Sequence, residues 1–194
     1  MHTLKTEESA RFRAAALALA AAVACGTGGR AMAEVVSAAG NGFEVRETAH
    51  IAAAADKVYA ALLIPANWWS SDHTFSHSAA NLALDARAGG CWCETLPGGG
   101  SVEHLRVVYV APGKVLRLRG ALGPMQAMAV EGSMTWILKS AADGTDLSMS
   151  YGVGGYNKDG FDELSKVVDR VLGEQVERLK RLVEGAPLPG AAAH

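Results

Sequence analysis

The segment from Leu82 to Gly120 constrains the fold more than any other part of this chain. It consists of short stretches with strand character, separated by Gly89-Gly90, by the loop from Pro97 to Gly100, and by Ala111-Pro112-Gly113. Glycine and proline in such combinations are turn residues, and short strands joined by tight turns are typical of an antiparallel meander. The segment therefore indicates an antiparallel sheet.

The same pattern extends on both sides of this segment. Residues 43–51 alternate between apolar and polar side chains and predict a first strand. Residues 53–63 have apolar side chains at helical spacing, and Pro65 ends that helix. Residues 67–73 are predicted to form a second short helix or a loop. The meander is then expected to comprise strands at about 82–87, 90–96, 101–110, 114–120, 128–139 and 145–152.

The last predicted element is a long amphipathic helix over residues 160–184. Its apolar stripe comprises Phe161, Leu164, Val168, Val171, Leu172, Leu179 and Leu182. Asp159 is positioned to cap its N-terminus, and Gly185 followed by Pro187 ends it. A helix of this length measures ~37 Å, so it can cover the apolar face of a curved sheet. We therefore expect an α+β domain with about six or seven antiparallel strands, two short helices after the first strand, and a cavity between sheet and helix.

The N-terminal 33 residues have the pattern of a secretory signal peptide. Lys5, Arg11 and Arg13 precede an apolar run from Ala14 to Cys25, and Ala31-Met32-Ala33 provides a cleavage site. This organisation predicts a signal peptide over 1–33, a linker over 34–41, the folded domain over 42–185 and a disordered tail over 186–194. The mature protein would be periplasmic or secreted. Two alternatives are an Ala-rich helix or disordered arm that stays on the protein, and a lipoprotein anchored through Cys25.

The charge balance argues against a nucleic-acid partner. The full chain has 18 basic and 20 acidic residues. The predicted leader holds four basic and two acidic residues, so its removal leaves a net charge of −4 and no basic stripe. Nothing after residue 33 has the pattern of a membrane span, so we expect no stable membrane insertion after removal of the leader.

Several motifs resemble those of one protein superfamily. These are Ala55 to Leu62 followed by Ile64-Pro65 and Trp68-Trp69, then Leu84 to Gly90, the hairpin from Val108 to Leu118, and Gly144-Thr145-Asp146-Leu147. Together they resemble the START-like, birch-pollen-allergen-like superfamily known as SRPBCC, which has a helix-grip fold. The nearest likeness is to the polyketide cyclase-like branch named for activators of the ninety-kilodalton heat-shock chaperone. The likeness covers about residues 43–184.

The resemblance implies a fold and leaves three functions open. The superfamily includes lipid carriers, polyketide cyclases and aromatases, and co-chaperones. The first hypothesis is an exported domain that binds a small hydrophobic or aromatic ligand, without a cofactor. The second is a cyclase or aromatase-like enzyme that uses His104, Cys93 or Tyr151 for acid–base chemistry. The third is a co-chaperone-like domain whose protein partner is unknown.

Cys91, Cys93 and His104 form the most reactive combination in the sequence. If Leu96 pairs with Ser101, Cys93 lies opposite His104, with Cys91 and Arg106 further along the same face. A cysteine beside a histidine is an activated thiolate, part of a metal site, a polar contact to a ligand, or a packed core residue. A register shift of one residue would separate them. We expect two thiols or an unusual redox pair, because a disulfide between Cys91 and Cys93 needs strained geometry.

Further pocket candidates are aromatic, sulfur-containing or imidazole side chains. The expected ligand-binding set is Trp69, His73, Cys91, Cys93, His104, Arg106, Met128, Met134, Met149 and Tyr151. Met125 is a further possible lining residue, and the four tryptophans are most simply core residues. His73 and His77 are four residues apart, a spacing that suits a metal on a helix, but a surface loop is the simpler interpretation.

Overall fold

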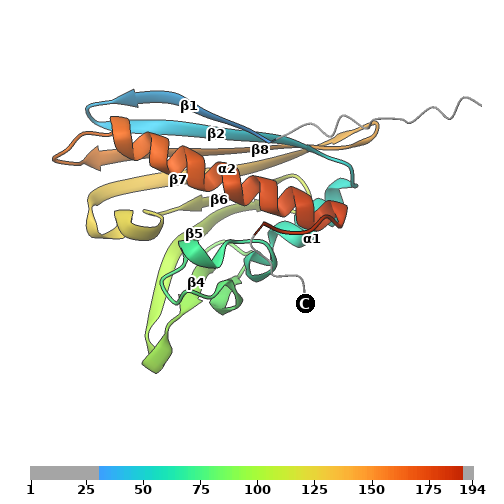
Figure 1. Cartoon of the computed structure of the whole chain (residues 1–194), viewed down its shortest axis with the longest axis horizontal. Helices are drawn as coiled ribbons and strands as arrows, with labels where there is room; N and C mark the ends of the chain where they lie inside the picture. Colours follow the sequence, from blue (N-terminus) through green and yellow to red (C-terminus); the bar gives the residue numbers. More distant parts are fainter. Residues whose placement is uncertain (1–30, 190–194) are drawn as a thin grey trace, which may run out of the picture.

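An eight-stranded antiparallel sheet curves around one long C-terminal helix in the computed structural model, which describes residues 31–189 (Figure 1). The strands are β1 (Met32–Ala39), β2 (Gly42–Ile51), β3 (Leu82–Leu84), β4 (Cys91–Thr95), β5 (Ser101–Ala111), β6 (Val115–Arg119), β7 (Ala129–Ala141) and β8 (Gly144–Tyr156). Their order in the sheet is β1-β2-β8-β7-β6-β5-β4-β3. The predicted α+β helix-grip fold is confirmed, with one strand more than the highest expected number.

The helices also follow the prediction in outline. Helix α1 (Ala55–Leu62) and the long helix α2 (Asp162–Glu184) are both present. The second short helix is instead a series of 3₁₀ turns at Pro65–Asn67, Ser71–His73 and Ala79–Asn81. Within residues 31–189 no helix is long and apolar enough to cross a membrane.

Strand β1 corrects the expectation of a linker over residues 34–41. These residues form most of β1 and its turn, in which Ala39 pairs with Gly42 across Gly40-Asn41. Gly-Asn between two strands is a two-residue hairpin signal. Most side chains of β1 are exposed, so it lacks the apolar alternation that reveals a strand. Residues 1–30 of the predicted leader and residues 190–194 of the predicted tail lie outside the described residues.

Helix α2 ends as predicted but begins differently. Its N-cap is Phe161, which makes no capping hydrogen bond through its side chain. The predicted cap, Asp159, is ion-paired with Lys158 instead. At the C-terminus, Gly185 has the left-handed conformation (φ 74°), and its N–H donates to carbonyl oxygens of the last turn.

The core lies between the concave face of the sheet and α2. It includes Met134, Trp136 and Leu138 of β7, Leu147, Met149, Tyr151 and Val153 of β8, and Val168, Leu172, Val176 and Leu179 of α2. The tryptophans form one cluster around Trp68, whose ring centroid lies 5.5–6.1 Å from those of Trp69, Trp92 and Trp136. All four are buried, as predicted for core residues.

One charged side chain, Glu47, lies among the inward-facing residues of β2. It is fully buried, and its carboxyl faces that of Asp169 on α2. Space for it depends on Gly173, because a Cβ there would lie 3.2 Å from Glu47 Oε2. Burial, with the neighbouring Asp169 carboxyl adding to it, raises the pKa of Glu47 to about 8. Glu47 is therefore a neutral acid below that pH.

The Glu47–Asp169 pair makes the fold more stable in mild acid than in base. Because the folded-state pKa of Glu47 is above its ordinary value of 4.5, the stabilisation is complete below pH 4.5 and is lost as the pH rises through about 8. We expect the free energy of unfolding to fall by roughly 2 to 4 kcal/mol from this group between pH 5 and pH 9. Glu47→Gln should remove that dependence, as measured by urea denaturation at both pH values.

The matched control is Glu44→Gln, on the same strand but on its exposed side. It should leave the pH dependence unchanged. An unaltered pH dependence in Glu47→Gln would contradict the assignment.

Candidate functional site

A cavity of about 380 Å³ lies beneath the N-terminal half of α2. The helix forms its roof, β4 and β5 form its floor, and two loops, residues 69–75 and 122–128, close its sides. Its lining residues are Trp69, Asp72, His73, Thr74, Phe75, Leu82, Trp92, His104, Leu122, Gly123, Pro124, Met125, Met128, Leu164, Val167, Val168, Val171 and Leu172. The size and the mostly apolar walls are those of a small-molecule site.

The cavity exists because α2 covers only part of the sheet. A helix is about 10 Å wide, whereas adjacent strands are ~4.8 Å apart, so one helix covers two or three strands. Helix α2 packs mainly against β1 and β2 (Figure 1). The inner face of β4 and β5 is therefore free to line a cavity.

The loop over residues 69–75 is held in place by side chains of α2. Gln175 Oε1 accepts a hydrogen bond from the Ser70 N–H at 2.8 Å, and Arg178 Nε donates to the Trp68 carbonyl at 2.8 Å. His73 lies 3.3 Å from Glu174 Oε2. These contacts fix one side wall of the cavity to its roof.

Glu94 and His104 form a buried polar pair at the cavity wall. His104 Nε2 lies 2.8 Å from Glu94 Oε2, and both side chains are almost fully buried. The carboxylate also accepts hydrogen bonds from the backbone N–H groups of Phe75 and Ser76. Burial opposes the charge, but these hydrogen bonds outweigh it and lower the pKa of Glu94 below its ordinary value.

A β-bulge turns His104 toward the inside of the sheet. Trp92 pairs with Leu105, but the next residue, Cys93, pairs with Glu103, so His104 is an extra residue on β5. His104 and Leu105 are consecutive and both buried, which a regular strand does not allow. The expected pairing of Cys93 with His104 is therefore wrong: Thr95, not Leu96, pairs with Ser101.

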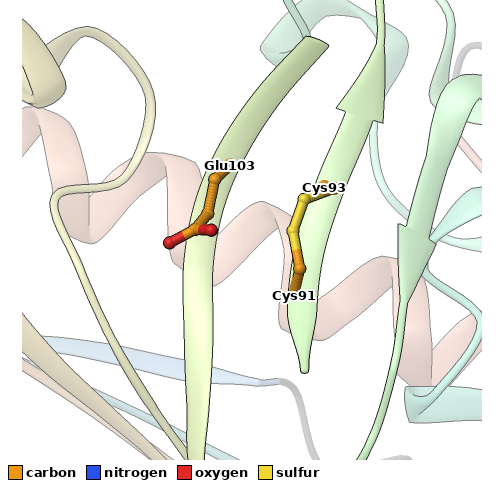
Figure 2. A group of neighbouring side chains, drawn as sticks. All are labelled: Cys91, Cys93 and Glu103. Carbon is orange, nitrogen blue, oxygen red and sulfur yellow. A yellow bond between two sulfur atoms is a disulfide. The ribbon is translucent and has the colours of Figure 1, made fainter. Parts of the chain in front are cut away.

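Cys91 and Cys93 are joined by a disulfide, so the expectation of two thiols is wrong, whereas its alternative, an unusual redox pair, stays a prediction. They are half-buried, alternate with the buried Trp92 along β4, and are not among the residues that line the cavity. Figure 2 shows the bridge between their side chains on β4. Glu103 lies on the neighbouring strand β5, and one of its carboxylate oxygens is within 4.8 Å of both sulfur atoms (Figure 2). Arg106 is ion-paired with Glu103 on the outer face of the sheet.

The predicted ligand-binding residues thus divide into three groups. Trp69, His73, His104 and Met128 line the cavity, as does Met125. Met134, Met149 and Tyr151 are buried in the core but are not among the lining residues. Cys91, Cys93 and Arg106 lie on the outer face, so the structure does not bring them to the cavity.

Tyr151 holds the loop that closes one side of the cavity. Its hydroxyl donates to the Gly120 carbonyl at 2.8 Å and accepts from the Leu122 N–H at 2.9 Å. Burial raises the pKa of its phenol far above the ordinary value. A neutral hydroxyl that makes both of its hydrogen bonds to the backbone has a structural role. This argues against the acid–base role that the enzyme hypothesis gives Tyr151.

His73 and His77, the pair considered for a metal, do not lie on one helix. His73 belongs to a single 3₁₀ turn, and His77 is exposed in the following loop with a positive φ of 57°. In the described part of the chain, the group of three metal-ligating side chains that lie together is Cys91, Cys93 and Glu103.

One known protein family matches most of this chain. The family described as polyketide cyclase / dehydrase and lipid transport matches residues 42–184. The chain belongs to this family. The match agrees with the expected superfamily; the narrower likeness to the heat-shock activator branch stays a prediction. No curated protein sequence matches the chain.

Solved structures share the fold of this polyketide cyclase-like domain at low identity. Protein MLL2253 from Mesorhizobium loti is 20% identical, with a TM-score of 0.55 over 75% of this chain and 99% of that one. An uncharacterized protein from Rhizobium leguminosarum is 15% identical, with a TM-score of 0.56 over 80% and 98%. CalU16 from Micromonospora echinospora is 16% identical, with a TM-score of 0.51 over 82% and 84%. At this identity the likeness extends to the fold alone.

Sequence reasoning missed Glu94 and most of the roof of the cavity in this polyketide cyclase-like domain. Glu94 and Trp92 occupy the two buried, alternating positions of β4. A charged residue at a strand position that alternates with core residues is a detectable signal of a polar site, because a buried charge needs partners. Leu164, Val167 and Val171 of α2 carry no comparable signal, since apolar residues on an amphipathic helix are usually core.

Tyr151→Phe should loosen the loop at Gly120–Leu122 without emptying the core. The variant keeps the ring but leaves the Leu122 N–H and the Gly120 carbonyl without their partner. We expect a loss of about 1–3 kcal/mol in the free energy of unfolding, measured by chemical denaturation. Tyr156→Phe is the control because that side chain is 70% exposed; equal effects in both variants would refute the anchoring role.

Proposed function

We propose that this domain binds a small, mainly apolar molecule with an aromatic or other ring in the cavity beneath α2. The observation that carries the proposal is an apolar cavity whose wall includes His104, which contacts the buried carboxyl of Glu94 behind it. Apolar walls provide affinity, and a few polar groups fix the orientation of a ligand. Membership of a family described by cyclisation, dehydration and lipid transport supports a small-molecule ligand.

The polar part of the ligand can be inferred from two side-chain atoms that need partners. Trp92 Nε1 and His104 Nδ1 belong to cavity-lining residues, have no hydrogen-bond partner within residues 31–189 and expose almost no surface, so a ligand reaches them only after these side chains shift. Trp92 is a donor, and a neutral His104 that donates through Nε2 to Glu94 is an acceptor through Nδ1. A hydroxyl group, which both donates and accepts, satisfies both. We therefore expect a phenol, enol or alcohol on an apolar skeleton.

Filling the cavity from its roof should abolish binding. Val171→Trp introduces a large side chain at a lining position of α2, and we expect at least tenfold weaker binding of a hydrophobic fluorescent probe. The titration is performed alongside native mass spectrometry of the purified protein, which detects a co-purified ligand.

The matched control is Arg170→Trp, one residue away on the exposed side of α2. It should bind the probe as the unaltered protein does. If both tryptophan variants bind equally well, the probe does not occupy this cavity and the proposal fails.

A second candidate function is catalysis at the same site, and the Glu94–His104 pair favours it. In that reaction His104 Nδ1 removes a proton from a carbon acid or hydroxyl of the bound molecule. The imidazolium that forms is stabilised by the Glu94 carboxylate through Nε2–H, and it returns the proton to the product. Such a proton transfer is the step that an intramolecular condensation or a dehydration requires. Cys93 and Tyr151 have no part in it.

Catalysis predicts a split between binding and turnover. His104→Gln and Glu94→Gln should each reduce turnover of a poly-β-ketone model substrate by about 10²- to 10⁴-fold, while probe binding changes by less than about tenfold. His50→Gln is the control, because His50 pairs with Asp146 on the surface outside this cavity. Unchanged turnover in His104→Gln would exclude the mechanism and leave ligand binding as the function.

We also infer that the mature protein is exported, from the leader pattern of residues 1–33. Cleavage after Ala33 would leave Glu34–Ala39 to pair with β2. N-terminal sequencing of the mature protein tests this directly. An intact leader would contradict export and would favour the co-chaperone hypothesis, which requires a cytosolic partner.

A further inference from the structure

The disulfide between Cys91 and Cys93 closes a very small loop. The two residues are separated by Trp92 alone. A disulfide stabilises a protein mainly by constraining the unfolded chain, and the effect decreases with the length of the closed loop. Joining two neighbours in one strand constrains the unfolded chain little, so stabilisation is a poor explanation for this bridge.

The bridge instead coincides with the bulge that turns His104 inward. Two residues apart in a regular strand, Cα atoms are separated by ~6.6 Å, whereas those of Cys91 and Cys93 are 5.4 Å apart. Strand β4 is thus contracted at the point where β5 carries its extra residue, between the Trp92–Leu105 and Cys93–Glu103 pairs. The shortened stretch of β4 therefore lies directly opposite the extra residue of β5.

The bulge connects the outer face to the cavity. Trp92, enclosed by the bridge, lines the cavity on the inner face, and Glu94 next to Cys93 binds His104. If β4 regained its regular length, the Cα atoms of Cys91 and Cys93 would move apart by ~1.2 Å, and His104 on the facing strand would move relative to Glu94.

We propose that Cys91–Cys93 is a thiol–disulfide exchange site whose oxidation state sets the position of His104 at the cavity wall. The reductant is a thiol, from a small molecule or from a partner protein. Its thiolate attacks the sulfur of Cys93, forms a mixed disulfide and releases Cys91 as a thiolate. A second thiol then attacks the mixed disulfide. The two cysteines gain two electrons and two protons, and the two thiols leave joined as a disulfide.

The surroundings of the bridge support this order of attack. Both cysteines are partly accessible on the outer face. Arg106 pairs in register with Cys91, and its positive charge stabilises a departing Cys91 thiolate. Glu103 pairs in register with Cys93 and accepts hydrogen bonds from Arg106, which holds the guanidinium on this face.

The experiment uses the folded full chain with millimolar glutathione as the thiol. The fraction of reduced Cys91–Cys93 is measured by alkylation and mass spectrometry, and the His104 ring is followed by ¹⁵N NMR. We expect reduction without unfolding, a shift of the His104 ring signals, and amide exchange at Glu103–Leu105 faster by at least about tenfold. Exchange around Val108, the extra residue of a second bulge on β5, should stay within about twofold and serves as the internal control.

The double variant Cys91→Ser with Cys93→Ser should reproduce the reduced state. If it fails to fold, the reduced unaltered chain still provides the comparison. These readouts need no cavity ligand, so they do not depend on the proposed function. The proposal is overturned if glutathione reduces the bridge only on unfolding, or if reduction leaves His104 and its amide exchange unchanged. It is also overturned if the reduced pair, with Glu103, retains zinc and does not reoxidise.

Discussion

The mismatch between one narrow helix and a wide curved sheet determines most of this structure. Helix α2 is docked against β1 and β2, so the far side of the sheet, at β4 and β5, must be covered by other means. Loops rather than a second helix cover it, and they leave a cavity instead of a filled core. Loop backbone carries polar groups that need partners, and Glu94, Gln175 and Arg178 provide them beside the cavity.

Glu94 meets that requirement on the side of the sheet, as Gln175 and Arg178 do on the side of α2. Its carboxylate accepts hydrogen bonds from the backbone N–H groups of Phe75 and Ser76 and contacts His104. The same side chain therefore closes the cavity and orients its one buried imidazole. A change at Glu94 acts on both, so only comparison with a change at His104 alone separates closure from chemistry.

Most of the fold was predictable from the sequence, whereas the geometry of the site was only partly so. Turn residues and alternation revealed the meander, and the apolar stripe revealed α2, because both signals are local in sequence. Strand β1 was missed because its exposed side chains do not alternate. The environment of His104 depends on one extra residue in β5 opposite a contracted β4. The position of a bulge depends on how two strands pair, and the sequence of one strand alone does not indicate it.

Glu47 and Glu94 show that surroundings, and not residue type, decide the charge of a buried carboxyl. Both lie at strand positions whose side chains face the core, and both are almost completely buried. Glu94 accepts hydrogen bonds from two backbone amides and pairs with His104, so its pKa is lowered and it is an anion at neutral pH. Glu47 has no such partners within residues 31–189, so burial, with the facing Asp169 carboxyl adding to it, raises its pKa to about 8. The anion is at the cavity, where it can hold an imidazole for a ligand. The neutral acid lies under the docked part of α2, where a charge would have no counterion. One helix thus rests on a protonated carboxyl at β2, whereas the ionised carboxyl on β4 contacts the imidazole that lines the cavity.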